Sequence, residues 1–420
     1  MTSIQFITNV SLIPGGSLSR VAEPVKGHVV TVRKQTAFAG VRSAELAVPT
    51  DLAAFPGMKF ASHVIAPAGT SKLPSFRIAN RDQDDYQVGH YNAVSLNGHF
   101  PSAVDFPAMV VTQVVDACCP RFGAPFLPAS RQIITDYLLP WEPESAIWFS
   151  PVGGDRYQAN TDLDTDNPEY VFDTAFYLDS AVSKHYGHFI FECLSRIYAL
   201  SLCRSIYDDI KVVIANEPHT GFQIPLLKAA GVPSPDIVKF NGIVRCKRLF
   251  LATPSLGLGQ YSSPTALDLC CSIRDHVAVP GMSTPDRIYL SRTGIEDRKL
   301  VNEAAVEQLF ERLGFAIIRP ETYPLPVQVT LLANARLIAG PSGSGLFNLA
   351  FEGRMRSAFI LVWEEFMQLS EMLIAAGHNF DLWYHLGVRL PRGPNDPWGS
   401  WTVDLGRLQS DVADWLALVD

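Results

Sequence analysis

The chain has 420 residues, of which 47% are hydrophobic, and a formal net charge of −8. This length and composition support two or three domains with ordinary buried cores. The negative charge argues against a general nucleic-acid binder, whose footprint is a basic surface, but it is compatible with a local basic cluster that binds one anionic ligand.

The cysteines and the N-terminus give two further expectations. Seven cysteines, two adjacent pairs among them and no C-x-x-C spacing argue against a zinc site or a disulfide framework. We therefore expect buried free thiols in a reducing compartment. The N-terminus lacks the pattern of a signal peptide, and there is no run of about 18 apolar residues, so no membrane span and a cytoplasmic location are expected.

Residues 1–165 are predicted to form a β-rich region. Its apolar runs are short, interrupted by Pro and Gly, and located at Val29–Val32, Met109–Val115, Gln132–Leu138 and Ala146–Phe149. Helical periodicity is scarce here. The alternating carboxylates Asp162, Asp164 and Asp166 superficially suit a divalent cation, but they lie in a polar stretch without the EF-hand glycine, so a solvated turn is the favoured interpretation.

Residues 166–282 show a different pattern, in which strands and helices alternate. The predicted strands are Val171–Leu178, Lys211–Ala215 and Arg248–Ala252, and the predicted helices are Gly187–Leu202, Phe222–Ala230 and Pro264–His276. Gly231 is expected to end the second of these helices. The alternation predicts a parallel sheet with covered faces, that is, a first Rossmann-like domain.

Residues 283–390 repeat the alternation after a Pro- and Gly-containing linker. The predicted strands are Arg287–Leu290, Phe315–Ile318, Arg336–Ala339 and Ala358–Trp363, and the predicted helices are Asn302–Leu313, Val327–Ala335 and Glu365–Ala376. A second Rossmann-like domain is the natural interpretation. The tail, residues 391–420, carries an amphipathic helix near Gln409–Val419 that is expected to pack back on an earlier domain.

A glycine-rich turn follows the third strand of this second domain. It contains Gly340, Ser342, Gly343, Ser344 and Gly345 and leads into a short helix. Glycines bring bare N–H groups close to a ligand, and a helix N-terminus favours a diphosphate. The turn fits neither Walker A, nor G-x-G-x-x-G, nor the G-x-S-x-G elbow. The alternative is a plain strand-to-helix turn.

Basic side chains follow the first strand of the same domain. Arg292 comes directly after the strand, and Arg298 and Lys299 follow in a loop. Arginine forks match phosphate oxygens, and the carboxyl ends of parallel strands line up along one edge of a sheet. We therefore expect Arg292 to lie near the glycine turn. For Arg298 and Lys299 alone, solvated pairs with Glu296 and Asp297 are the competing interpretation.

A third candidate site lies in the first Rossmann-like domain. His188 and Glu192 are four residues apart and share one face of the predicted helix. A carboxylate can orient an imidazole and raise its basicity, or take a proton itself. The alternative is a packed structural histidine. The spacing is also seen in metal sites, but no third ligand is apparent.

Taken together, these segments resemble glycosyltransferase family 61 over roughly Tyr177 to Val362. The matching positions are Gly187-His188-Phe189-Ile190-Phe191-Glu192 with Leu194 and Arg196, then Ser291-Arg292, Arg298-Lys299 and Asn302-Glu303, then Gln328 to Ala335, and finally Gly340 to Asn348. Three positions depart from the family pattern. Ser342 replaces a usual His, Ser344 a usual Ala, and Lys299 a usual Arg.

The resemblance implies a GT-B fold, in which two Rossmann-like domains face a cleft. It implies inverting transfer of a sugar from a nucleotide-sugar, expected to be a UDP-sugar, to a saccharide acceptor, without a cofactor or an obligatory metal. The resemblance assigns acceptor binding to the first domain, with His188 or Glu192 as the catalytic base. It assigns binding of the donor and its phosphates to the second domain. The residues implied are Arg292, Arg298, Lys299, Asn302, Glu303, Gly340, Ser342, Gly343, Ser344, Gly345 and Asn348.

The implied role is synthesis of capsule, exopolysaccharide or another cell-surface glycan. Saccharides and nucleotide-sugars are the expected partners, nucleic acid is not, and a homo-oligomer is left open. Because Ser342 replaces the usual histidine, a second hypothesis stays open: the protein is a non-catalytic nucleotide-sugar-binding partner in a polysaccharide assembly complex. A third, an unrelated hydrolase, is disfavoured because no nucleophile–base pair accompanies the glycine turn.

Overall fold

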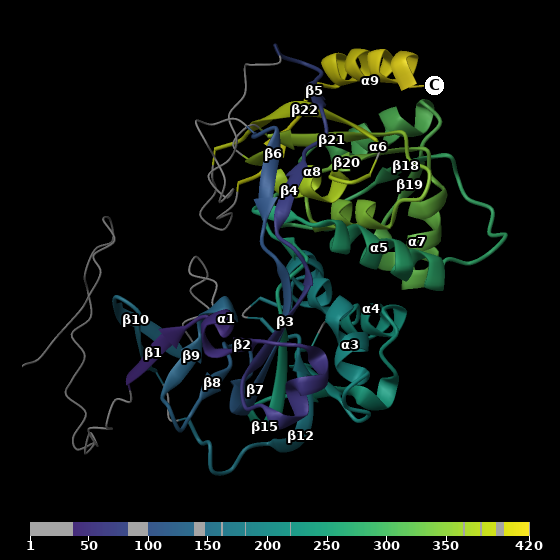
Figure 1. Ribbon diagram of the computed structural model, residues 1–420. Helices are drawn as coiled ribbons and strands as arrows, with labels where there is room; N and C mark the ends of the chain where they lie inside the picture. Colours follow the sequence, from purple (N-terminus) through teal and green to yellow (C-terminus); the bar gives the residue numbers. More distant parts are fainter. Residues whose placement is uncertain are drawn as a thin grey trace, which may run out of the picture. The chain divides into compact units, whose positions relative to one another are not determined.

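The computed structural model describes residues 37–82, 100–137, 148–160, 163–180, 182–218, 220–363, 366–378, 380–391 and 399–419. These residues belong to one compact unit, Thr36–Asp420, with a mixed α/β architecture (Figure 1). The predicted strand Val29–Val32 lies outside the described residues. In the described part of the chain, no helix has the length and apolar character that a membrane span requires.

The first large sheet contains twelve described strands. They are β1 (Ala37–Val41), β2 (Val48–Pro49), β3 (Ala61–Ala66), β7 (Met109–Pro120), β8 (Phe126–Leu127), β9 (Gln132–Ile134), β10 (Phe149–Gly153), β11 (Arg156–Ala159), β12 (Tyr170–Tyr177), β13 (Lys211–Ala215), β14 (Ile237–Phe240) and β15 (Ile243–Ala252). Strands β15, β12, β13 and β14 are parallel neighbours, whereas β7 pairs with β15 in antiparallel fashion. The β-rich N-terminal region therefore continues the same sheet across residue 165, and this position does not separate two sheets.

Shorter elements lie between and beside these strands in the sequence. They are α1 (Ser43–Leu46), the 3₁₀ helix Leu52–Gly57, the hairpin strands β16 (Leu256–Gly257) and β17 (Tyr261–Ser262), the paired strands β4 (Gly69–Lys72) and β6 (Ala103–Phe106), α4 (Gln223–Ala229) and α5 (Pro264–Val277). Helix α4 ends before Gly231, whose φ of 83° is the left-handed conformation that glycine adopts without strain. All seven cysteines are free thiols, six of them buried, as expected from their number and spacing.

The helix predicted at Gly187–Leu202 is continuous but irregular. It comprises α2 (Tyr186–His188), a π-helical turn (Phe189–Cys193), a 3₁₀ stretch (Leu194–Ala199) and α3 (Leu200–Arg204). In the irregular part, side chains donate hydrogen bonds to backbone carbonyls. Ser195 Oγ donates to Phe191 O, and Arg196 Nε donates to Glu192 O at 2.6 Å. Such side-chain bonds compete with the regular helical ladder, and π-turns are frequent at functional sites.

The second large sheet has the strand order β19-β18-β20-β21-β22-β23, with β5 also paired to β22. The strands are β5 (Phe76–Ile78), β18 (Arg287–Leu290), β19 (Ala316–Ile318), β20 (Leu337–Pro341), β21 (Ser357–Trp363), β22 (Asp381–Arg389) and β23 (Trp401–Thr402). Strands β18 to β22 are parallel. Because β19 lies on one side of β18 and β20 on the other, the winding direction reverses between β18 and β20, which makes this position a topological switch point.

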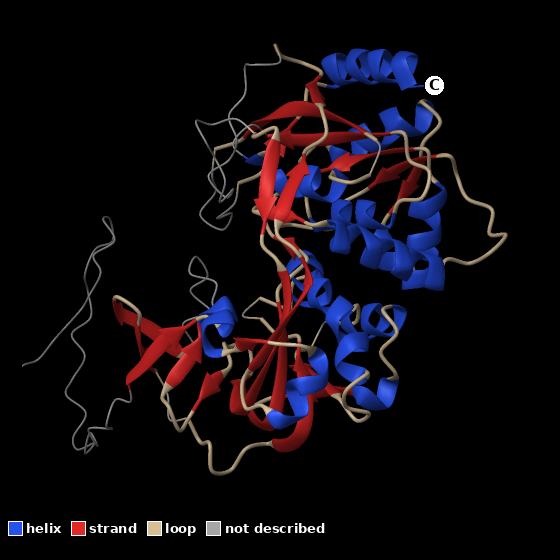
Figure 2. Cartoon of the chain, viewed as in Figure 1, coloured by secondary structure: helices blue, strands red, loops and turns tan. Residues whose placement is uncertain are grey.

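Helices cover this second sheet on two sides (Figure 2). They are α6 (Glu303–Arg312), α7 (Leu325–Asn334), the 3₁₀ helix Ser344–Phe351, α8 (Leu369–Ala375) and α9 (Leu405–Val419). Helix α6 contacts α9, whereas α5, α7 and the 3₁₀ helix contact one another. All seven residues of β21 are buried, as expected for a parallel strand with both faces covered.

The C-terminal helix α9 packs on the second sheet itself. The Trp415 side chain is fully buried, its ring packs against Phe315 and Phe359, and its Nε1 donates to Ser357 Oγ at 2.9 Å. One turn earlier, Asp411 Oδ2 lies 2.8 Å from His385 Nδ1. The tail is therefore an integral layer of this sheet.

We expect Trp415→Ala to lower the free energy of unfolding by about 3–5 kcal/mol, because it leaves a large cavity in the core. Leu418→Ala on the same helix is the matched control. Its side chain is 64% exposed, and its effect should stay within about 0.5 kcal/mol. Urea unfolding followed by circular dichroism measures both. Equal effects of the two substitutions would show that α9 contributes no buried layer.

Candidate functional site

The basic segment and the glycine-rich turn meet at the switch point of the second sheet. Strand β18 ends at Leu290, just before Arg292, and β20 ends at Pro341, just before the turn. The two strands are direct neighbours, with Tyr289 opposite Ala339. In open α/β sheets, ligands bind outside the carboxyl ends of the strands at such a switch point. The adjacency expected from the sequence is therefore present.

A cavity of about 720 Å³ opens at this position, which is within the usual range for small-molecule sites. The residues lining it are His185, Tyr186, Gly221, Phe222, Pro225, Leu290, Ser291, Arg292, Ile295, Asp297, Arg298, Pro320, Glu321, Tyr323, Pro324, Leu325, Pro326, Gln328, Pro341, Ser344, Gly345, Leu346 and Asn348. Five residues assigned to donor binding from the sequence are among them: Arg292, Arg298, Ser344, Gly345 and Asn348.

Glycines allow the close packing of the turn on its neighbours. A Cβ at Gly343 would collide with Nη1 of Arg292, so the guanidinium lies directly against the turn backbone. Gly343 also has φ 154° and ψ 179°, a conformation that essentially only glycine adopts. A Cβ at Gly340 would lie 2.6 Å from Leu290 O. Gly340 and Gly343 thus shape the site without lining it.

Two arginines concentrate positive charge at this end of the cavity. The Arg292 backbone N–H donates to Glu303 Oε1 at 2.6 Å, and its Nη2 donates to Asp297 O at 2.9 Å. Burial, and then the nearby Arg298, lower the pKa of Arg292 from its ordinary value. Arg298 lies 4.7 Å over the Phe366 ring and has a φ of 55°, an unusual conformation for a side-chain-bearing residue. Two cations held close together favour an anionic ligand.

Three predicted donor residues lie outside the cavity lining and support it from behind. Lys299 Nζ pairs with Glu296 at 3.0 Å on the surface, and Arg298 Nε pairs with Asp297 at 3.2 Å, so both ion pairs of the competing interpretation of this loop are present. Asn302 Nδ2 donates to Val403 O at 2.8 Å and so ties the start of α6 to the C-terminal segment. Glu303 holds the Arg292 backbone, and burial raises its pKa to about 7.

Ser342, the position of the usual family histidine, is also absent from the lining. Its hydroxyl donates to Glu371 Oε1 at 2.5 Å, and its backbone N–H donates to Leu361 O at 2.8 Å. Glu371 is fully buried, and desolvation raises its pKa to about 7. Within the described residues, its Oε2 has no hydrogen-bond partner. The pair anchors the turn to α8.

The opposite wall of the cavity comes from helices attached to the first sheet. The Tyr186 hydroxyl donates to Asn348 Oδ1, and its ring packs edge-on against Phe222 at 5.2 Å. A Cβ at Gly187 would lie 2.5 Å from Phe347, so α2 rests directly on the 3₁₀ helix after the glycine turn. Segments more than 150 residues apart in the sequence therefore meet at the site, since Tyr186 and Asn348 are separated by 162 positions.

The predicted pair His188 and Glu192 does meet, but neither residue lines the cavity. His188 Nδ1 lies 3.3 Å from Glu192 Oε2, which also accepts from Ser180 Oγ at 3.3 Å. His185 lines the cavity instead, with its ring centroid 6.0 Å from that of His188. The reason is local: His185 precedes the helix with φ −93° and ψ 132°, so it does not follow the helical face that the spacing predicts.

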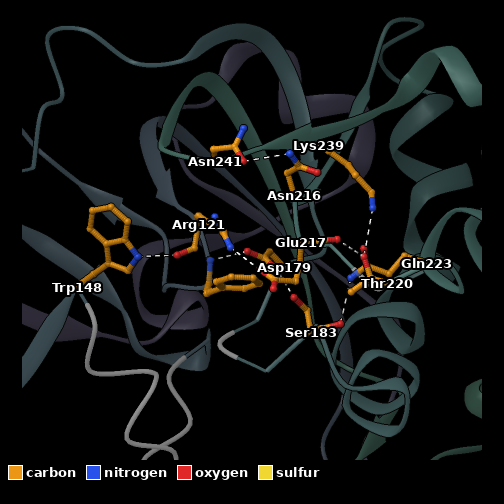
Figure 3. Close-up of polar contacts among 11 residues, drawn as sticks. Arg121, Trp148, Asp179, Ser183, Asn216, Glu217, Thr220, Gln223, Lys239 and Asn241 are labelled. Atoms are coloured by element: carbon orange, nitrogen blue, oxygen red, sulfur yellow. Dashed lines mark hydrogen bonds and ion pairs between the residues drawn. The ribbon is translucent and has the colours of Figure 1, made fainter.

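A polar network at the carboxyl ends of β12, β13 and β14 supports this wall (Figure 3). The fully buried Asp179 accepts from Phe122 N at 2.7 Å and from Ser183 Oγ at 2.6 Å, and Gln223 Nε2 donates to Ser183 O at 3.0 Å. Burial raises the pKa of Asp179 to about 6. The network joins the segment before His185 to the first turn of α4.

The other acidic candidate is a turn. Asp164 Oδ1 accepts from the Asn167 backbone N–H at 3.1 Å, and Asp162 lies outside the described residues. In the portion of the chain covered by the described ranges, no three His, Cys, Asp or Glu side chains gather as ligands for a metal ion.

Comparison with known proteins bears on the family resemblance. Residues 186–360 match the sequence model of the family Glycosyltransferase 61. The matched region begins at Tyr186 on one wall of the cavity, includes Arg292 and the glycine turn, and ends in β21. The resemblance to glycosyltransferase family 61 is thus confirmed for residues 186–360. No curated protein matches the chain.

We expect Glu371→Gln to change the pH dependence of stability. The folded pKa of about 7 exceeds the ordinary value of 4.5, so the neutral carboxyl stabilises the fold below pH 4.5 and this stabilisation is lost as the pH rises through 7. The loss amounts to at most about 3 kcal/mol. The neutral glutamine avoids it, so the variant should match the wild type in acid and be the more stable protein near about pH 8.

Urea unfolding at several pH values measures this difference. Glu311→Gln, on an exposed part of α6, is the control. Its free energy of unfolding should differ from that of the wild type by the same small amount at every pH. A difference between Glu371→Gln and wild type that does not vary with pH would mean that this carboxyl is charged throughout.

Proposed function

We propose that the protein is an inverting glycosyltransferase that moves a sugar from a nucleotide-sugar, a UDP-sugar in the simplest case, to a saccharide acceptor. One observation carries the proposal. Arg292, Arg298 and the glycine turn lie together on the wall of a 720 Å³ cavity at the switch point of a parallel sheet. In this proposal the two sheets correspond to the acceptor and donor domains of a GT-B enzyme, and the product belongs to a capsule, exopolysaccharide or other cell-surface glycan made in the cytoplasm.

The arginines fit the chemistry of the leaving group. As the bond to the sugar breaks, the nucleoside diphosphate gains negative charge. Arg292 and Arg298 can bind its oxygens through charged forks, and the N–H groups that begin the 3₁₀ helix at Ser344 add partial positive charge. Because these groups are held in place before the reaction, they stabilise the developing charge without reorganisation. We propose that they do so without a metal ion.

Inversion needs a base that deprotonates the acceptor hydroxyl on the face opposite the diphosphate. His185 lines the same cavity as Arg292 and comes from a segment attached to the first sheet, so it is our candidate. The pair His188–Glu192 was assigned as the base from the sequence. It does not line the cavity, but the His188 ring lies next to that of His185, so the Glu192 carboxylate can favour proton uptake by His185.

The second candidate is a nucleotide-sugar-binding partner without transferase activity. Ser342 favours it, because the side chain at the position of the usual histidine is bound to Glu371 and does not line the cavity. The two candidates differ in one measurable property. Only the enzyme releases free sugar or UDP when incubated with a panel of UDP-sugars.

Calorimetric titration with UDP, with and without EDTA, tests the donor site directly. Micromolar binding that survives EDTA supports the proposed metal-independent site. Binding that disappears with EDTA would contradict the proposed role of the arginines, and failure to bind UDP, GDP and ADP alike would contradict the donor site itself.

Arg292→Ala should weaken UDP binding and turnover together, by about 2–4 kcal/mol in transition-state terms, because a partly buried charge contact to the diphosphate is lost. Arg312→Ala is the control, since that side chain is exposed at the far end of α6. Isothermal titration and steady-state kinetics measure both variants. Wild-type kinetics in Arg292→Ala would remove this residue from the site.

His185→Ala should lower turnover by at least about 100-fold and leave UDP affinity nearly unchanged, as expected for a lost general base. His188→Ala and Glu192→Gln should lower turnover less and shift the pH at which activity rises. Rates of UDP release across a pH series distinguish the three variants. A collapse in the latter two with wild-type rates in His185→Ala would restore the assignment made from the sequence.

A further inference from the structure

The cavity has two chemically different ends. One end holds the arginines and the glycine turn described above. The other is built from the segment after β19 and the first turn of α7 and is largely apolar, with Pro320, Tyr323, Pro324 and Pro326 in the lining. The proposed function accounts for the first end only. The apolar end needs a ligand group that is flat or apolar and attached to the diphosphate.

The strand order places these ends in a row. Strand β19 is the edge strand next to β18, and β20 lies on the other side of β18. Along the carboxyl edge, the segment after β19 therefore comes first, Arg292 after β18 second, and the glycine turn after β20 third. A ligand with its diphosphate on the second and third positions extends its remaining part over the first.

Glu321 carries a carboxylate on this edge of the sheet, in the segment after β19. It follows β19, the second parallel strand of the sheet in chain order, by three residues and lines the cavity. In dinucleotide-binding folds an acidic residue near the end of the second strand accepts hydrogen bonds from the ribose hydroxyls. The chain thus has a carboxylate at the equivalent topological place.

The surroundings of Glu321 leave its carboxylate available for a ligand. The residue is exposed, and among the residues that the structure describes the carboxylate has no hydrogen-bond partner. Both Glu321 and Arg292 line the cavity, and the negative charge of Glu321 raises the pKa of Arg292, against the lowering by burial and Arg298. A carboxylate accepts only, and vicinal hydroxyls can both donate to its two oxygens.

We propose that Glu321 and the Tyr323–Pro326 segment form a ribonucleoside subsite, in which Glu321 accepts from the ribose hydroxyls and the Tyr323 side of the segment packs on the base. The proposal rests on the proposed donor site and assigns the nucleoside end of that donor. Tyr323 is 38% exposed in the lining, which gives a base an aromatic surface to cover.

Gln328 completes the segment. Its Nε2 donates to Tyr323 O at 2.8 Å, which holds the turn that carries the tyrosine and fixes the orientation of the amide. Gln328 also lines the cavity, so its carbonyl oxygen is the acceptor left for a ring N–H of a base. The subsite therefore selects for ribose through Glu321 and positions the base through Tyr323 and Gln328.

The test pairs each variant with ligands that lack one part of the nucleotide. The ligands are the nucleoside diphosphate among UDP, GDP and ADP that binds the wild type most tightly, its 2′-deoxy form, and inorganic pyrophosphate, each titrated calorimetrically. The wild type should prefer the ribose form by about 10-fold, the usual value of one hydrogen bond to a charged group. Glu321→Ala should abolish this preference and leave pyrophosphate binding equal or tighter.

Matched variants separate the subsite from a general effect. Glu321→Gln keeps one acceptor oxygen and should retain part of the ribose preference, whereas Glu311→Ala, an exposed glutamate on α6, should behave as wild type. Tyr323→Ala should weaken the ribose and deoxyribose forms equally and leave pyrophosphate unchanged.

The outcomes distinguish failure of the subsite from failure of the donor site. Nucleotide and pyrophosphate binding with an unchanged ribose preference in Glu321→Ala overturns the subsite and leaves the donor site standing. Equal affinity of the wild type for the ribose and deoxyribose forms overturns it as well. If the wild type binds neither nucleotide nor pyrophosphate, the donor site fails and the subsite with it.

Discussion

The contact between the Arg292 guanidinium and the backbone of Gly343 is the constraint on which the site depends. It relies on two neighbouring strands that end at the same level and on glycine at position 343, where the φ of 154° disfavours any other residue and a Cβ would displace the end of the Arg292 side chain. Glu303 and Asp297 then hold the arginine from the other side. The positive end of the cavity is therefore fixed by packing before any ligand arrives, which is the condition for effective charge stabilisation.

Supporting groups are arranged around this contact in a way that separates two roles. Residues with polar atoms in the cavity lining, such as Arg298 and Asn348, can meet a ligand. Others, such as Asn302 and Glu371, connect the site to the C-terminal segment and to α8. A substitution in the second group should act through the position of the first. This distinction explains how the turn can be anchored here although Ser342 stands in place of the usual histidine.

Much of the second sheet could be predicted from the sequence, because local signals specify it. Apolar runs gave β18, β20 and β21 nearly to the residue, and Gly314 and Gly377, both with positive φ, mark the ends of the helices expected before them. The meeting of Arg292 with the glycine turn followed from one rule about parallel strands. The order of strands and helices along the chain was therefore enough to predict that the residues of this half of the site lie together.

The remainder depended on contacts or rotations that local periodicity does not encode. The His188 spacing predicted the face of a regular helix, whereas the helix contains a π-turn and His185, just before it in extended conformation, lines the cavity instead. The role of Asn302 depends on Val403, 101 residues away. The continuation of the first sheet through β7 and β15 was missed because strand partners distant in sequence leave no periodic signal.

Strand β5 has a consequence for how the chain reaches its native state. It pairs with β22 of the second sheet, and the nearby Asn80 amide donates to Leu386 O, 306 positions later. In the sequence, however, β5 lies between β3 and β7, which belong to the first sheet. During synthesis this strand has no partner until nearly the whole polypeptide has left the ribosome. Closing so large a loop is slow, and an unpaired strand edge invites association with other chains. The pairing of β5 with the second sheet should therefore form late in the folding of this protein.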